Sequence, residues 1–120
     1  RRCGWFDGVL ARFSARVNGL TGLAVTKLDV LDTLPEVSVC TGYQTVDGVI
    51  EDFPADLVQL GVVEPVYETL PGWMVPTHEI STRQGLPKAA RAFLGRLEEL
   101  AGTPIEMVSV GPKRSQIIRF

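Results

Sequence analysis

Two short segments of the sequence carry groups suited to ligand binding, and each follows an apolar run. Residues 20–25 form one run, which predicts a strand buried on both faces, and Thr26-Lys27-Leu28-Asp29 comes directly after it. Residues 105–110 predict a second buried strand, which ends in Ser109-Val110-Gly111-Pro112. Ligands of open α/β sheets bind beyond the carboxyl ends of the strands, so these two segments form the candidate site.

The spacing of Lys27 and Asp29 suits recognition of a guanine base. A carboxylate accepts two hydrogen bonds at once, from the ring N1–H and the exocyclic amine, and adenine presents neither donor in that arrangement. The aliphatic stem of Lys27 can cover the purine face while its ammonium stays in water. Backbone N–H groups of Ser109, Val110 and Gly111 can donate to the guanine carbonyl oxygen.

The Lys-x-Asp tripeptide alone is not specific, because it occurs by chance and often forms a solvated surface pair. Three functions therefore stay open on the residues alone. Asp29 can belong to a GTP-dependent enzyme, or to a guanine-nucleotide-binding module without chemistry of its own. It can also be a helix cap in a plain structural domain.

Composition restricts the class of protein. The chain has 120 residues, a net charge of −2, 45% hydrophobic and 22% charged residues, which predicts one globular domain. No apolar run reaches the ~18 residues of a membrane span. A pI of 5.3 argues against a generic nucleic-acid or membrane-surface binder. The chain opens on Arg1 without Met or a signal region, so we expect it to be part of a longer chain.

Cysteine and charge patterns add two expectations. Cys3 and Cys40 are too few for a disulfide scaffold and lack metal-site spacing, so we expect buried thiols in a reducing compartment. Residues 1–27 hold five bases and one acid, whereas residues 28–79 hold ten acids and no Lys or Arg. Arg1 and Arg2 therefore either await an anionic ligand or form a solvated end.

Hydrophobic periodicity predicts the elements that position the two segments. A helix over residues 8–18 starts at Asp7 and ends at Gly19, with an apolar stripe toward the core at Val9, Leu10, Phe13 and Val17. A second helix over residues 86–100 has a longer apolar stripe and a charged face that we expect to be solvated.

The strands are predicted by alternation and turns. Residues 37–43 alternate, and Asp47-Gly48 predicts a hairpin that returns over residues 49–53. Residues 63–70 predict a strand, and Pro65 within it indicates either an edge strand or the start of a strand. Residues 73–84 are predicted to form a loop. The order of elements gives an α/β fold with a small antiparallel hairpin.

Four motifs stand in order along the chain: RRCGWFD at residues 1–7, TKLDVL at 26–31, PVYETLPGW at 65–73 and SVGP at 109–112. Their order and spacing resemble the region near the carboxyl end of adenylosuccinate synthetase, over essentially all 120 residues. The resemblance implies the carboxyl-terminal part of a mostly parallel sheet flanked by helices. It makes residues 1–120 the guanine-binding portion of a longer enzyme.

The resemblance also implies an activity. The family is a homodimeric, cytoplasmic ligase of purine nucleotide (AMP) biosynthesis, which joins L-aspartate to IMP with hydrolysis of GTP and gives adenylosuccinate, GDP and phosphate. GTP is the co-substrate and Mg²⁺ acts in the full-length enzyme. No nucleic acid or membrane is implied as a partner.

Residue by residue, Lys27, Leu28 and Asp29 resemble the family's guanine-recognition segment, and Ser109, Val110 and Gly111 resemble its second guanine-contacting loop. Arg1 resembles the last arginine of the loop that closes over aspartate and phosphate, which makes it part of the GTP site. Arg2 receives no role. The phosphate loop, the catalytic Asp and His and the Mg²⁺ ligands are not among these residues.

The other conspicuous residues are predicted to be structural. His78 lacks a second ligand or nucleophile nearby in sequence, so we expect a solvated loop residue. Trp5 and Trp73 are expected to be core or interface anchors. Tyr43 and Tyr67 are expected to pack within strands.

Since this chain lacks the catalytic acid and base, we predict that it catalyses nothing and binds GTP weakly. Charge-assisted contacts to phosphate are the strong ones, and they are missing here. Purified chain incubated with IMP, L-aspartate, GTP and Mg²⁺ should give no adenylosuccinate by its ultraviolet absorbance. Turnover above a no-protein control would contradict the prediction.

Overall fold

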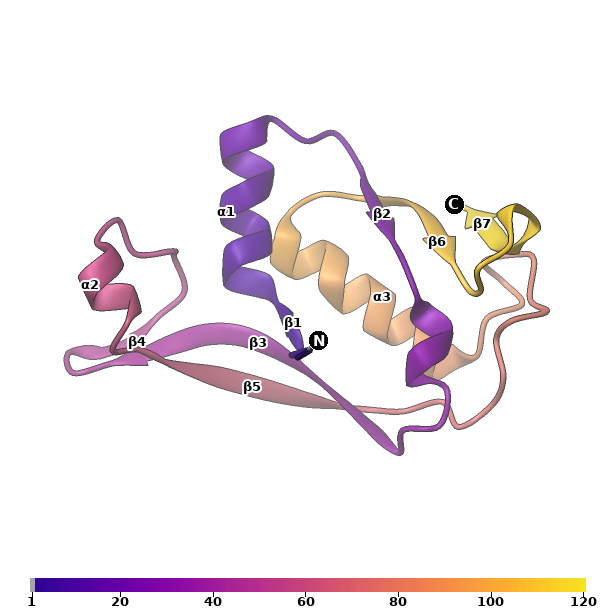
Figure 1. Cartoon of the computed structure of the whole chain (residues 1–120), viewed down its shortest axis with the longest axis horizontal. Coiled ribbons are helices and arrows are strands. Elements are labelled where there is room, and N and C mark those ends of the chain that lie inside the picture. Colours follow the sequence, from indigo (N-terminus) through magenta and orange to yellow (C-terminus); the bar gives the residue numbers. More distant parts are fainter. Residues whose placement is uncertain (1) are drawn as a thin grey trace.

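The computed structural model describes residues 2–120, which form two small mixed sheets with a helix packed between them (Figure 1). One sheet contains β1 (Phe6–Asp7), β3 (Glu36–Thr45), β4 (Gly48–Ile50) and β5 (Glu64–Pro71). The other contains β2 (Leu23–Val25), β6 (Ile105–Ser109) and β7 (Ile117–Arg119). The helices are α1 (Gly8–Asn18), α2 (Leu57–Leu60) and α3 (Lys88–Ala101), with 3₁₀ turns η1 (Leu28–Leu31) and η2 (Arg114–Gln116).

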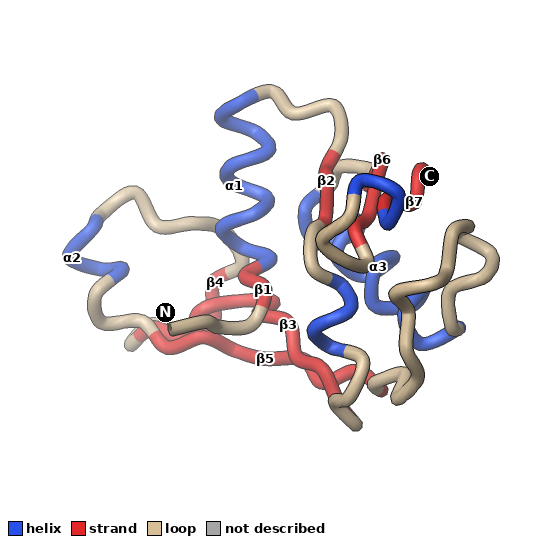
Figure 2. The backbone as a smooth tube through the Cα atoms, turned by 45° about the vertical axis from the view of Figure 1, so that its right-hand side comes forward, coloured by secondary structure: helices blue, strands red, loops and turns tan. Residues whose placement is uncertain are grey.

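The predicted α/β class and the hairpin are confirmed. Each sheet has one parallel pair, β1 with β3 and β2 with β6, and antiparallel pairs complete both sheets. Thr45 pairs with Gly48 across the predicted Asp47-Gly48 turn. Among residues 2–120 β5 pairs only with β3, and Pro65 is its second residue, so β5 is an edge strand with Pro65 near its start. Figure 2 shows how the long β3–β5 ribbon runs beneath α1.

Helix α1 begins and ends where the sequence predicted. The Oδ1 atom of Asp7 accepts a hydrogen bond from the Leu10 N–H at 3.0 Å, which caps the first turn. Gly19 has φ 61° and ends the helix in the left-handed conformation, which suits a residue without a Cβ.

The predicted apolar stripe of α1 is only partly buried. Val9 is 3% exposed, but Leu10, Phe13 and Val17 are 46%, 42% and 66% exposed. The reason is geometric: α1 packs on β3 and α3 with its buried side. The rest of the stripe is covered only in part, where the Phe53 ring stacks on Phe13 with the ring centroids 4.7 Å apart. Periodicity identifies an apolar face but not the element that covers it.

The prediction of a doubly buried strand over residues 20–25 is wrong. The strand is only Leu23–Val25, and it pairs with β6 alone at the end of a three-stranded sheet. Ala24 is therefore exposed and Leu20 is 41% exposed. An apolar run of this length does not distinguish an edge strand from a central one.

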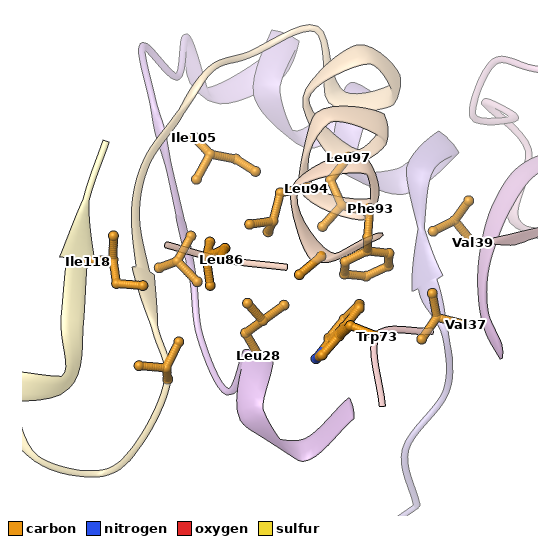
Figure 3. Close-up of a cluster of buried hydrophobic side chains, with 13 residues drawn as sticks. Leu28, Val37, Val39, Trp73, Leu86, Phe93, Leu94, Leu97, Ile105 and Ile118 are labelled. Atoms are coloured by element: carbon orange, nitrogen blue, oxygen red, sulfur yellow. The ribbon is translucent and has the colours of Figure 1, made fainter. Parts of the chain in front are cut away.

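The core lies between the two sheets and is filled by α3. The buried side chains of α3 pack against strands β3, β6 and β7 and against the turn η1 (Figure 3). Leu28 projects from η1 into this cluster and is 1% exposed. The cluster consists of Leu28, Val37, Val39, Trp73, Leu86, Ala90, Phe93, Leu94, Leu97, Ile105, Val108, Val110 and Ile118. The turn that follows β2 is thus fixed by the core itself.

Two further expectations need correction. Cys40 is buried as predicted, but Cys3 is exposed. The charged face of α3 is not simply solvated, because the Arg96 Nε donates to Glu68 of β5 at 2.7 Å. Glu98 also accepts a hydrogen bond from the Ile105 N–H at 3.0 Å. These contacts tie α3 to both sheets, and the pattern of charges along one helix does not reveal them.

A buried tyrosine joins the start of α1 to β3. The Tyr43 hydroxyl donates a hydrogen bond to Oδ2 of Asp7, and Tyr43 is only 5% exposed. Burial and the hydrogen bond to the neighbouring carboxylate raise the pKa of Tyr43 well above its usual value near 10.

Replacing Tyr43 with Phe should lower the free energy of unfolding by about 1–2 kcal/mol at neutral pH, because one buried hydrogen bond is lost. Folded Tyr43 stays protonated where the unfolded chain ionises, so its contribution is complete below about pH 10 and falls as the pH rises further. Urea unfolding measured between neutral pH and pH 11 should show that the free energy of unfolding of the parent falls at alkaline pH. Tyr67→Phe is the control, because the Tyr67 side chain is exposed, and it should show the same fall. An equal alkaline loss in Tyr43→Phe would contradict the assignment.

Candidate functional site

The structure brings the two predicted segments together. Val25 of β2 pairs with Val108 of β6 in parallel, so both strands end at the same edge of their sheet. Beyond that edge the Lys27 N–H donates a hydrogen bond to Oγ of Ser109 at 2.9 Å. This contact joins residues 82 positions apart in the chain, and it confirms that the loops 26–29 and 109–112 are neighbours.

Lys27 has a backbone conformation that is unusual for a residue with a Cβ. Its φ of 61° and ψ of 39° are left-handed, and it stands directly before η1. Such a conformation costs of order 1 kcal/mol or more and persists where the surroundings impose it. Here the hydrogen bond to Ser109 and the burial of Leu28 hold the turn on both sides of the strained peptide.

Asp29 lies in the turn η1 with its carboxylate available. Its side chain is half-buried, and within residues 2–120 it forms no hydrogen bond or ion pair. It is therefore not the helix cap that the structural alternative required. Asp29 borders a hollow of about 580 Å³, a volume within the range of small-molecule sites.

The hollow is lined mainly by a loop that the sequence did not assign to the site. Met74, Val75, Pro76 and His78 face Asp29 across it. Lys27 borders a different hollow, of about 280 Å³, beside Trp5. Asp29 and Lys27 thus border two different hollows, although only one residue separates them in the chain.

The loop 109–112 offers mainly backbone groups to a ligand. The Val110 side chain is fully buried, and its N–H already donates to the Gln116 carbonyl at 2.9 Å. In the described part of the chain the Gly111 N–H has no acceptor, so it is the donor left for a ligand. A Cβ on Gly111 would meet the end of the Gln116 side chain, which would have to move away from its present position.

A half-buried carboxylate ties the loop after β5 to the turn η1. Asp32 accepts hydrogen bonds from the Trp73 Nε1 at 2.7 Å, from the Thr77 N–H at 2.8 Å and from the Thr77 hydroxyl at 2.9 Å. Figure 3 shows the indole nitrogen of Trp73 directed toward η1. Sequence reasoning missed this role for Asp32, because no local pattern pairs it with residues more than 40 positions away.

A third contact closes the loops into a ring. The Gln116 Nε2 donates to the His78 carbonyl at 3.1 Å, which joins η2 to the loop after β5. The His78 side chain itself is 55% exposed, as predicted for a solvated loop residue. Trp73 is a core anchor as predicted, at 6% exposed, whereas Trp5 is 41% exposed.

Arg1 lies outside the described residues. Across residues 2–120 no three His, Cys, Asp or Glu side chains converge on a point that can hold a metal ion. None of the helices in this range has the length and apolar content that crossing a bilayer requires.

Comparison with known proteins agrees with the geometry. A family model described as adenylosuccinate synthetase matches residues 1–118. An adenylosuccinate synthetase of Heliobacterium modesticaldum is 54% identical over 120 residues, and adenylosuccinate synthetase 1 of Chromobacterium violaceum is 53% identical over 121 residues. Each alignment covers 100% of this chain and 28% of the relative.

A solved structure is also similar. The structure titled as fully ligated adenylosuccinate synthetase from Plasmodium falciparum superimposes with a TM-score of 0.93 at 30% identity, and covers 100% of this chain and 29% of that chain. This chain therefore spans little more than a quarter of the length of the relatives it matches. Because the family model covers residues 1–118 and the fold agrees over the whole chain, the chain belongs to the adenylosuccinate synthetase family.

Proposed function

We propose that this chain is the carboxyl-terminal, guanine-recognising portion of a GTP-dependent ligase of AMP biosynthesis. The whole enzyme joins L-aspartate to IMP and releases adenylosuccinate, GDP and phosphate. Family membership supports the reaction. The observation that carries the binding role is the 2.9 Å hydrogen bond from the Lys27 N–H to Ser109, because it places two base-reading segments at one sheet edge.

In this proposal Asp29 selects guanine over adenine. Its carboxylate has no partner within residues 2–120, so both oxygens are available for the N1–H and the exocyclic amine of guanine. Adenine offers N1 as an acceptor at the same position, which would leave a partly desolvated carboxylate unpaired. The Gly111 N–H donates to the guanine carbonyl oxygen, and the Lys27 stem covers the base.

The side chains of Leu28 and Val110 act only indirectly. Both are in the core, with 1% and 0% exposure, so they fix the two loops while backbone groups meet the ligand. The strained Lys27 backbone also helps to position the loop 26–29, because it turns the chain sharply from β2 into η1. Recognition thus relies on groups that are positioned before the ligand arrives.

The rest of the activity requires parts that these residues do not supply. Contacts to phosphate, the catalytic acid and base, and Mg²⁺ are assigned to other segments of the enzyme. Arg1 is proposed to neutralise charge on a carboxylate or on the transferred phosphoryl group. The parent is proposed to be a homodimer in the cytoplasm.

Replacing Asp29 with Asn exchanges one acceptor oxygen for a donor, which should weaken binding of GDP by about 1–3 kcal/mol, or roughly 5- to 150-fold. Titration of the ¹⁵N-labelled chain with GDP and ADP gives the two dissociation constants, even for weak binding. Asp47→Asn is the matched control, since Asp47 lies in the exposed hairpin turn and Asn-Gly suits that turn equally. Equal GDP affinity in Asp29→Asn and Asp47→Asn would remove Asp29 from the site.

Replacing Ser109 with Ala removes the acceptor for the Lys27 N–H. We expect GDP affinity to fall by about 3- to 10-fold, which corresponds to loss of one ordinary hydrogen bond. Amide hydrogen exchange at Lys27 should accelerate at the same time, whereas exchange in α3 should not change. Ser115→Ala, in the exposed turn η2, serves as the control. Unchanged exchange at Lys27 would show that this contact does not hold the loop.

A further inference from the structure

One wall of the hollow beside Asp29 comes from a segment that neither base-reading loop includes. Residues 74–78 follow β5, and all of them except the buried Thr77 line the 580 Å³ hollow together with Asp29. Three of these residues, Met74, Val75 and Pro76, have apolar side chains, and Met74 and Val75 are 59% and 44% exposed. Exposed apolar side chains opposite a carboxylate without a partner provide the two surfaces that a heteroaromatic base requires.

This wall is held at both of its ends by the same carboxylate. Asp32 accepts from the Trp73 indole at one end and from the backbone and hydroxyl of Thr77 at the other. Thr77 is fully buried, and its hydroxyl lies within 3.0 Å of both oxygens of Asp32. Charge-assisted hydrogen bonds of this kind are the strong ones in proteins. Asp32 is only three residues from Asp29, and its N–H donates to the Asp29 carbonyl at 3.1 Å, so the wall is joined directly to the turn that carries Asp29.

The backbone between the two anchors is strained. Met74 has φ 54°, and it is one of the two residues other than glycine with positive φ in the described part of the chain. The other is Lys27, which stands directly before η1, the turn that contains Asp29. Strained residues of this type persist only where the surrounding structure imposes them, and they cluster at ligand sites.

We propose that residues 74–78 form a third wall of the guanine site, and that Asp32 is the positioning residue that holds this wall against the turn carrying Asp29. The inference rests on the proposed function. The apolar side chains cover the flat face of the purine, while Asp29 reads its edge. Covering the base excludes water from the carboxylate, and this raises the cost of binding a base that cannot donate to Asp29.

The first test alters the wall and leaves the hydrogen bonds from Trp73 and Thr77 to Asp32 in place. Val75→Asp places a second carboxylate on the surface of the hollow opposite Asp29. We expect at least a 10-fold loss of GDP affinity, measured by titration of the ¹⁵N-labelled chain, with an unchanged melting temperature. Val46→Asp is the matched control because Val46 is 97% exposed in the β3–β4 turn. Equal GDP affinities for the two variants would overturn the proposal.

The second test alters the hydrogen bonds between Thr77 and Asp32. Thr77→Val keeps the buried volume but removes the hydroxyl bonds to Asp32, and Thr77→Ser keeps the hydroxyl. We expect Thr77→Val to lower the ratio of GDP affinity to ADP affinity by 5-fold or more, and Thr77→Ser to keep the ratio of the parent chain. A change in melting temperature without any change in that ratio would show that Asp32 has only a structural role, and would overturn its assignment.

The two proposals fail in different ways. If the parent chain binds GDP and ADP equally, the guanine site itself is wrong. If the parent prefers GDP and Asp29→Asn abolishes the preference, while Val75→Asp and Thr77→Val both retain it, the guanine site stands and the third wall is wrong.

Discussion

The site depends on one hydrogen bond between two strand ends. The Lys27 N–H donates to Ser109, and this contact sets the distance between a turn that carries a carboxylate and a loop that carries a free backbone donor. The parallel pairing of β2 with β6 brings these ends to one edge of the sheet. Leu28 and Val110 are buried in the core, which holds both loops in position. The strain at Lys27 is tolerated because Leu28 is locked into that core immediately afterwards.

The surrounding loops act as a closed ring rather than as independent segments. Asp32 joins η1 to the loop after β5, and Gln116 joins that loop to the segment after β6. Each contact uses a side chain with a backbone or indole partner, so each is directional as well as attractive. A ring of this kind keeps its groups in place before a ligand arrives, which lowers the entropic cost of binding.

Much of the fold followed from local patterns, and the exceptions have a common cause. Asp7 and Gly19 gave the limits of α1, and Asp47-Gly48 gave the hairpin, because caps and turns are encoded by neighbouring residues. The exposure of Phe13 and the edge position of β2 did not follow, since they depend on which distant element covers a surface. The candidate site shows the same division. Lys27, Asp29 and Ser109 were found from strand-end positions, whereas Asp32 and Thr77 were missed because their contact spans 45 residues.

In the proposed site the Asp29 carboxylate accepts two hydrogen bonds from guanine. The most direct measurement is the exchange of the base protons of ¹⁵N-labelled GDP in the presence of the chain. We predict that the N1–H and amino protons become protected from solvent exchange and show cross-relaxation to protons of the turn that contains Asp29. If these protons exchange at the rate of free GDP while the rest of the nucleotide is bound, the carboxylate does not read the base and the account is wrong.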